Sequence, residues 1–328
     1  MNIENNTVHN FVGIDISKKV FDVCFLSQNG QMEQRQLEQS PKGYQTLIEL
    51  IGQDAICVME ATSTYHLPLA LWLHDQGVQV VIENPLKIKR FSQMHLQRCK
   101  SDKADARMIR EYATTIVSKK INLWRPQADE IQQLKQCDTL SQSLNKELTA
   151  ITNTHEALGQ LSVVNTAVKQ IIQRTIKHLK TALSELDKQM QQLIKKHYND
   201  TYQLLLSIPG VGPKTSVMLI CQTDNFKNFD DVKKFLSYIG MSPRTFESGS
   251  SIKGKGHITK VGNGRLRSLL YMCSWTAKTC NLQCASIYEK MLQKGKPEKV
   301  IKVAIAHKLL RQAFGVIKRQ QPFDPEFA

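Results

Sequence analysis

The 328-residue chain lacks the features that mark several protein classes. Its eight cysteines form no CxxC pair and most lie in apolar runs, so we expect reduced thiols without a disulfide or zinc framework. No apolar run reaches the ~18 residues that a membrane span needs. The polar N-terminal stretch MNIENNTVHN lacks a signal-peptide core. These absences predict a cytoplasmic protein without a membrane partner.

Acidic residues are scarce in the C-terminal part. Residues 201–328 hold 20 Lys and Arg against 8 Asp and Glu, whereas residues 1–200 hold 24 against 21, within a net charge of +15. The uneven charge favours a polyanion, most simply nucleic acid, that docks mainly on the C-terminal part. The alternative on charge alone is a soluble basic protein. The length allows two domains, each with its own core.

The N-terminal part alternates β-rich and helical patterns. Turn residues follow the β-rich runs, and Ser40-Pro41 and Asn84-Pro85 are typical of helix starts. Apolar strands separated by helices indicate an α/β sheet covered on both faces. The predicted elements are a hairpin over Phe11–Leu26, strands at Gln31–Leu37, Ala55–Met59 and Val78–Ile82, and helices at Pro41–Ile51, at Leu67–Gln76 and from Pro85 onward.

Four acids of this part suggest a metal site. Asp15 interrupts an apolar strand, where a carboxylate is costly to bury unless a cation meets it. Glu60 ends another strand, and Asp102 and Asp105 share one face at the head of a helix. Converging carboxylates of this kind hold two cations ~3.5 to 4 Å apart for phosphodiester displacement. Oxygen-only ligands predict two Mg²⁺ ions per active site.

Each of these acids also has a simpler interpretation. Asp102 would serve as a helix cap or dipole partner, Asp105 as a solvated helix residue, and Glu60 as a charge at a strand end. Asp15 has no comparable explanation.

Two heptad seams follow in the middle of the chain. Apolar residues recur in alternating steps of three and four from Leu134 to Leu158 and again from Ile172 to Leu193. Ser141 and His155 weaken the first seam. We predict two long helices over residues 126–200, either as a hairpin or as arms that dimerise, acting as a spacer and assembly element.

The stretch LLLSIPGVGPKTSVMLI resembles a helix-hairpin-helix. In such a motif the turn that holds Gly210 and Gly212 exposes backbone N–H groups to a DNA phosphate, with Lys214 and Thr215 at the next helix start. The alternative is an ordinary turn, because PGVG is common. The spacing of a nucleotide-binding P-loop is missing.

Glycine and serine are dense between Ser248 and Gly256, ahead of a basic helix over Arg265–Ala277. A small nucleophile among cations suits backbone cleavage, because the cations stabilise charge on a pentacovalent phosphate. Composition alone does not choose among Ser248, Ser250 and Ser251. The neighbouring cations are Lys253, Lys255, Lys260, Arg265 and Arg267.

The motifs GIDISK, MEATSTYH, NP with a basic run, and KSDKADA occur in an order that resembles the N-terminal domain of IS110-family transposases. The resemblance implies an RNase H-like fold similar to the RuvC resolvase. It also implies that Asp15, Glu60, Asp102 and Asp105 are the metal-binding DEDD set. The family motif A-T-G has Ser63 in place of its glycine here.

A second set of motifs, G-x-x-P-R, serine-glycine, I-x-K-x-G-N and L-R, resembles the second domain of the same transposases. It implies that Ser248 is the nucleophile, with Ser250 and Ser251, which replace a usual G-K, as alternatives. Phosphate contacts are implied for Lys260, Asn263 and Arg267. The resemblance covers Phe11 to Phe314.

The resemblance implies a transposase that cuts and rejoins DNA through a covalent phosphoserine intermediate. Its implied partners are element ends, target DNA and a structured noncoding guide RNA, with the site shared between protomers of a dimer or tetramer. The implied domains are a RuvC-like domain (1–125), a coiled-coil arm (126–200) and a mainly α transposase domain (201–328). The alternatives are a Piv-type DNA invertase, a junction resolvase that uses water, and a non-catalytic DNA-binding protein with a coiled-coil arm.

Overall fold

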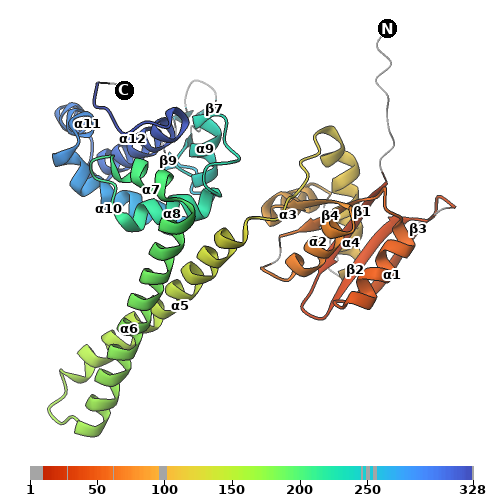
Figure 1. The fold of residues 1–328 in the computed structure, drawn as a ribbon, viewed down its shortest axis with the longest axis horizontal. Coiled ribbons are helices and arrows are strands. Elements are labelled where there is room, and N and C mark those ends of the chain that lie inside the picture. The colour runs from red at the N-terminus through yellow and green to blue at the C-terminus, as the bar shows by residue number, and fades with distance from the viewer. Residues whose placement is uncertain are drawn as a thin grey trace. The chain divides into compact units, whose positions relative to one another are not determined.

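The computed structural model describes residues 10–27, 29–61, 63–95, 102–244, 247–248, 252–253 and 257–326, with the backbone alone at 102–103, 247–248 and 252–253. The chain forms two compact units, Met1–Pro126 and Gln127–Ala328 (Figure 1). The second unit contains both the predicted arm and the predicted C-terminal domain.

The first unit is built on a five-stranded sheet in the order β3-β2-β1-β4-β5. Strands β1, β2 and β3 form an antiparallel meander, whereas β1, β4 and β5 are parallel. The predicted hairpin and strands are confirmed within a residue or two. The strands are β1 (Phe11–Ile16), β2 (Val20–Leu26), β3 (Met32–Glu38), β4 (Ile56–Glu60) and β5 (Gln79–Glu83).

Helices cover both faces of this sheet, as the sequence predicts. Val12 of β1 belongs to a core with α1 and α2, while Phe11, pointing the other way, belongs to a core with α3 and α4. The side chains of Ser40 and Asn84 cap α1 and α3 as expected. The helices are α1 (Pro41–Ile51), α2 (His66–Asp75), α3 (Pro85–Met94) and α4 (Asp102–Thr115), followed by the short η1 (Val117–Lys119).

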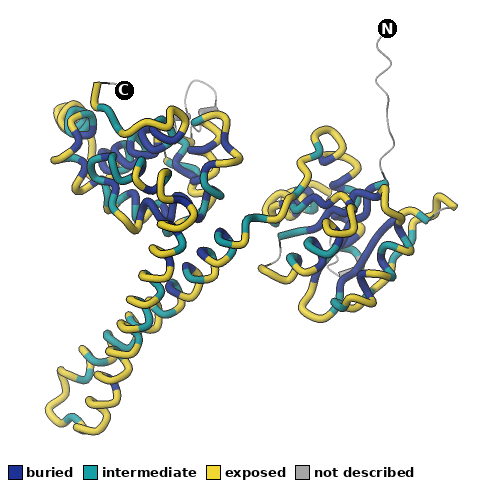
Figure 2. Tube along the Cα trace, viewed as in Figure 1, coloured by how far each residue is buried: buried dark blue, intermediate teal, exposed yellow. Residues whose placement is uncertain are grey.

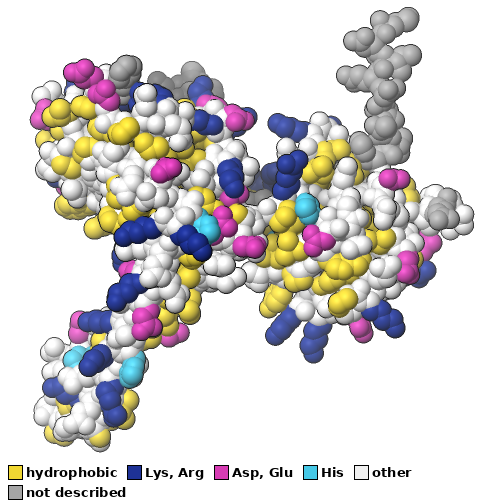
Figure 3. All heavy atoms as spheres, viewed as in Figure 1, with side chains coloured by type: hydrophobic (Ala, Val, Ile, Leu, Met, Phe, Trp, Pro, Cys, Tyr) yellow, Lys and Arg dark blue, Asp and Glu magenta, His cyan; other side chains and the backbone are white. Residues whose placement is uncertain are grey.

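Two long helices, α5 (Asp129–Leu158) and α6 (Thr166–His197), open the second unit and pack against each other (Figure 1). The seam residues are buried or half-buried, and the outward positions are mostly exposed (Figure 2). The heptad prediction is confirmed, and within one chain its outcome is a hairpin. Lys and Arg side chains project along this hairpin (Figure 3).

Six further helices surround a core that also includes Ile131 of α5 and Ile194 of α6. Between α9 and α10 the described backbone forms two short ladders, in which β6 (Pro243–Arg244) pairs with β9 (His257–Ile258) and β7 (Glu247–Ser248) pairs with β8 (Ile252–Lys253). The six helices are α7 (Asn199–Leu206), α8 (Pro213–Thr223), α9 (Val232–Ile239), α10 (Gly264–Cys280), α11 (Leu282–Gln293) and α12 (Glu298–Arg319).

Within the described ranges, no helix has the length and apolar character needed to cross a membrane. The cysteines in these ranges are all free thiols, and three of them, Cys57, Cys221 and Cys284, have pKa values that burial raises to about 12.

Candidate active site

Strand register brings Asp15 and Glu60 to the same edge of the sheet. Ile14 of β1 lies opposite Met59 of the parallel strand β4, so Asp15 and Glu60 are the next residues on the two strands. Residues in register on neighbouring strands project to the same face. Two of the four predicted metal ligands are therefore neighbours, although 44 positions separate them in the sequence.

Two more acids continue this row across the sheet. Asp22 of β2 lies opposite Asp15, and Glu83 of β5 lies opposite Glu60. The row therefore runs Asp22, Asp15, Glu60, Glu83 over four adjacent strands. The sequence pattern did not single out Asp22 or Glu83, because only the pairing of strands shows that they belong to the row.

The outer acids of the row have protein partners. Asp22 is 4% exposed and accepts hydrogen bonds from Gln36 Nε2 at 3.1 and 3.4 Å. Glu83 Oε2 accepts from Lys87 Nζ at 2.8 Å. Burial, reinforced by Glu83, raises the pKa of Tyr112 on α4 to about 12, so this phenol remains a donor beside the carboxylate. These partners hold the ends of the row in place.

Helix α4 packs directly on the face to which the row points. Gly13, two residues before Asp15, projects to the same face of β1. A Cβ at Gly13 would lie 2.3 Å from both Ala106 O and Arg110 N of α4, so only glycine permits this approach. The sequence pattern gave no indication of this contact.

The direction of α4 places its first turn near the acids. Arg110 Nε donates to Phe11 O at 3.1 Å, at the start of β1. The N-terminal turn of α4, which carries Asp102 and Asp105, therefore extends toward the end of β1 that carries Asp15. All four predicted acids belong to one edge of the first unit.

The described acids do not lie close enough together to form a complete set of metal ligands. Among the described side chains, which exclude Asp102, no three His, Cys, Asp or Glu form a group of metal-binding size. Asp15, Glu60 and Asp105 are half-buried, and each interacts with other groups of the protein. The donors at this edge are carboxylate oxygens, which fit Mg²⁺ by chemistry.

Ser63 lies just beyond Glu60 with a φ of +49°, in the left-handed region. The family motif has a glycine at this position, and the backbone keeps the conformation that glycine favours. Serine accepts it at a cost of about 1 kcal/mol.

The predicted nucleophile belongs to the second unit. Ser248 on β7 pairs with Ile252 on β8, so its backbone is part of a short antiparallel ladder. Its side chain, together with Ser250 and Ser251, lies outside the described residues.

Residues after this ladder cap the start of α10 and anchor its first turn. Asn263 Oδ1 accepts from Leu266 N at 3.0 Å and caps the helix, while Arg267 Nη1 donates to Ile239 O at 3.0 Å. These two predicted phosphate contacts therefore have structural partners as well. Lys260 is exposed.

The PGVG turn connects α7 to α8 and packs against α10. A Cβ at Gly210 would lie 2.6 Å from Ala277 Cβ, and Thr215 is 3% exposed with its hydroxyl 3.1 Å from Cys273 Sγ. Packing accounts for these two positions, and the buried Thr215 hydroxyl is turned away from a phosphate in solvent. Gly212 and Lys214 remain accessible, although Lys214 Nζ lies 3.0 Å from Asp187.

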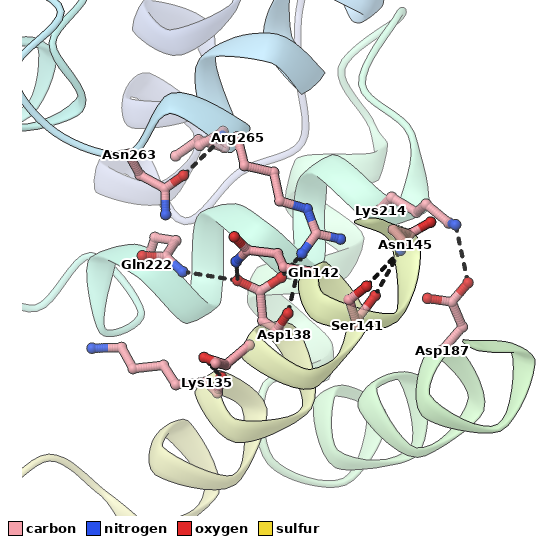
Figure 4. Close-up of polar contacts among 12 residues, drawn as sticks. Lys135, Asp138, Ser141, Gln142, Asn145, Asp187, Lys214, Gln222, Asn263 and Arg265 are labelled. Atoms are coloured by element: carbon pink, nitrogen blue, oxygen red, sulfur yellow. Dashed lines mark hydrogen bonds and ion pairs between the residues drawn. The ribbon is translucent and has the colours of Figure 1, made fainter. Parts of the chain in front are cut away.

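A buried carboxylate joins α5, α8 and α10 (Figure 4). Asp138 is 2% exposed, forms an ion pair with Arg265, and accepts hydrogen bonds from Gln142 at 3.0 Å and Gln222 at 3.4 Å. Burial raises the pKa of Asp138, and Arg265 acts in the opposite direction. The sequence pattern grouped Arg265 with the cations near the serine, but in the structure its guanidinium pairs with Asp138 of α5.

Asp138→Ala is expected to lower the free energy of unfolding by about 3 to 5 kcal/mol, because it leaves the Arg265 charge in a partly buried place without its partner. Urea unfolding followed by circular dichroism measures the change. Asp187→Ala is the matched control, since it removes an exposed ion pair worth at most about 1 kcal/mol. Equal losses for the two variants would contradict the role given to the buried pair.

Comparison with known proteins places this arrangement in a family. A DEDD-type IS110 transposase model matches residues 12–164, and a model described as Transposase IS116/IS110/IS902 family matches residues 202–289. The pilin gene-inverting protein of Moraxella bovis is 32% identical, over 96% of this chain and 97% of its own. The transposase for insertion sequence element IS1111A of Coxiella burnetii is 23% identical, over 79% of this chain and 75% of its own. The chain therefore belongs to the IS110 family of transposases.

Proposed function

We propose that the protein recombines the DNA of an insertion sequence through magnesium-dependent serine chemistry. Family membership implies an enzyme that cuts and rejoins DNA. The observation that carries the finer proposal is the register of β1 and β4. It sets Asp15 beside Glu60 at the sheet edge toward which the first turn of α4 extends.

An RNase H-like fold for the first unit is part of the proposal. A three-stranded antiparallel meander continued by two parallel strands, with helices on both faces, supports it. Asp15, Glu60, Asp102 and Asp105 would hold Mg²⁺, which supplies Lewis-acid stabilisation of charge on a phosphate. The protein supplies oxygen donors at fixed strand positions and, through α4, covers the face on which they lie.

In the proposed reaction, the Ser248 oxygen bonds to the scissile phosphorus as the bond to one deoxyribose oxygen breaks. The serine proton leaves, and the departing deoxyribose oxygen gains one. The phosphoserine ester conserves the energy of the broken bond, so a second strand end rejoins the DNA by the reverse exchange without ATP. The site is composite in this proposal, with the acids of one protomer and the serine of another.

Ser248→Ala is expected to abolish a covalent protein–DNA adduct formed on element-end DNA in Mg²⁺. The adduct is detected by denaturing electrophoresis with labelled DNA. Ser237→Ala, at an exposed serine of α9, is the control and should retain the adduct. An undiminished adduct in Ser248→Ala would reassign the nucleophile to Ser250 or Ser251. Cleavage without any adduct would favour a resolvase that uses water.

Nucleic-acid partners follow from the same proposal. The second unit carries most of the net charge of +15, and its α7–turn–α8 segment is proposed as a helix-hairpin-helix with Gly212 and Lys214 toward a phosphate. The proposal also includes a structured guide RNA as a partner and a dimer or tetramer as the active assembly. Sequencing the nucleic acid that copurifies with the protein tests the RNA directly.

Site-specific inversion is the second candidate function. The full-length similarity to the Moraxella bovis pilin gene-inverting protein favours it. A plasmid with two sites in inverted orientation separates the candidates. Inversion reverses the intervening segment, whereas transposition joins element ends to a new target.

A further inference from the structure

A groove of about 490 Å³ opens on the second unit beside the start of α10. Its lining residues come from α10, from α12, and from β9 and nearby residues. The residues named here are those of its lining that lie in the described part of the chain. They are Met241, Ile258, Lys260, Gly264, Arg267, Ser268, Tyr271, Met272, Val303 and Ala306.

The groove combines an apolar interior with an aromatic ring. Met241, Ile258, Val303 and Ala306 supply apolar lining, and Tyr271 contributes its half-buried ring. An apolar groove lined by an aromatic residue suits a nucleobase, because every base presents a π-face for stacking.

The charge of the groove is of one sign. Lys260 and Arg267 line it, and its described lining residues include no Asp or Glu. The hydrogen bond from Arg267 Nη1 to Ile239 O fixes the guanidinium in place. Because Lys260, Gly264 at the start of α10 and Arg267 all line the groove, a phosphate fits at this end of α10.

The aromatic ring farther along α10 does not serve the same purpose. Trp275 is 48% exposed, but Lys302 Nζ lies 3.0 Å from its ring centroid and Lys278 Nζ lies 5.6 Å from it. A cation already covers one face of this indole. Tyr271 is therefore the ring to which we assign stacking.

We propose that this groove holds one unpaired nucleotide of the nucleic-acid substrate, with the base against Tyr271 and its phosphate between Lys260 and Arg267. The proposal rests on the proposed function only in taking nucleic acid as the substrate. A segment of a second copy is the less suitable occupant, because the chain carries a net charge of +15 and the groove is itself cationic.

The test is a binding measurement with short oligonucleotides that carry 2-aminopurine at one unpaired position. It is made in EDTA, so that strand cleavage does not contribute. Fluorescence should fall as the base stacks in the wild-type protein.

Tyr271→Ala should weaken binding of the unpaired strand by roughly 5- to 100-fold and restore the fluorescence. Tyr271→Phe should retain both effects, because it keeps the ring.

A second variant fills the groove without removing a packed side chain. Ser268 is exposed on α10, and Ser268→Trp should block the unpaired base even if Tyr271→Ala fails to fold. Lys260→Ala should weaken binding, whereas Lys290→Ala, at an exposed lysine of α11 outside the groove, should not. Parallel DNA and RNA oligonucleotides identify which strand the groove prefers, and preference for either supports the proposal.

Unchanged fluorescence and affinity in both Tyr271→Ala and Ser268→Trp would overturn the proposal. So would a shift in oligomeric state with unaltered oligonucleotide binding, since the groove would then hold protein. Loss of cleavage alone bears on the proposed function and not on this groove. An inactive Asp15→Asn protein should still quench 2-aminopurine.

Discussion

Asp15→Asn is expected to reduce Mg²⁺-dependent strand cleavage by at least about 1,000-fold, because it removes a ligand charge from the proposed metal site. The first unit should remain folded. Asparagine has nearly the volume of aspartate, and the substitution relieves like-charge repulsion with Asp22 directly across the strand pair. Cleavage of labelled element-end DNA and urea unfolding measure the two effects.

Asp54→Asn is the matched control, since Asp54 is an exposed acid of the same unit outside the carboxylate row. Asp54→Asn should change neither the rate of strand cleavage nor the free energy of unfolding. Normal strand exchange by Asp15→Asn would remove Asp15 from the metal site and leave its position in the sheet without a chemical explanation. Cleavage lost together with the fold would make the residue structural.

Gly13→Ala is expected to destabilise the first unit by at least about 3 kcal/mol. Its added methyl would meet two backbone atoms of α4 at 2.3 Å, and backbone atoms cannot rotate away as a side chain can. Activity should fall as well, because α4 carries Asp102 and Asp105 and would be pushed from the sheet. Thermal unfolding by near-ultraviolet circular dichroism, together with the cleavage assay, measures both.

Gly77→Ala separates this clash from the general cost of replacing glycine. Gly77 has a φ of +81°, but an added methyl there would have nothing within 4 Å, so its cost should be limited to about 1 to 2 kcal/mol of backbone strain. Similar losses at both positions would show that α4 yields to the methyl. The close packing on β1 would then not be what positions the two aspartates.

Local patterns in the sequence predicted the local structure of the first unit. The apolar alternation of Phe11–Leu26 predicted β1 and β2, and Ser40 and Asn84 predicted the starts of α1 and α3. The acids were found because Asp15 interrupts an apolar strand. Asp22 and Glu83 were not, because their membership of the row depends on register between strands that are distant in the sequence.

The second unit shows a different limit. The first heptad seam steps by three from Leu134 to Cys137 and so predicts Cys137 as an inward position. The adjacent Asp138 is nevertheless more deeply buried, because α5 also packs on α8 and α10 there. The heptad period of α5 describes its packing on one partner helix, α6, and carries no information about its contacts with other helices. Likewise, composition counted Arg265 as a cation for DNA, whereas it pairs with Asp138 of α5, and composition did not show that Arg267 donates one hydrogen bond to Ile239 O of α9.

The link between Asp138 and Arg265 has a mechanical consequence. Arg265 occupies the first turn of α10, and Asp138 lies on α5, one of the two helices of the α5–α6 hairpin. Bending the hairpin at this point means separating Arg265 from a buried carboxylate. A force applied to the far end of the hairpin is thus transmitted to the start of α10, so that motion of the hairpin and motion of this helix are coupled.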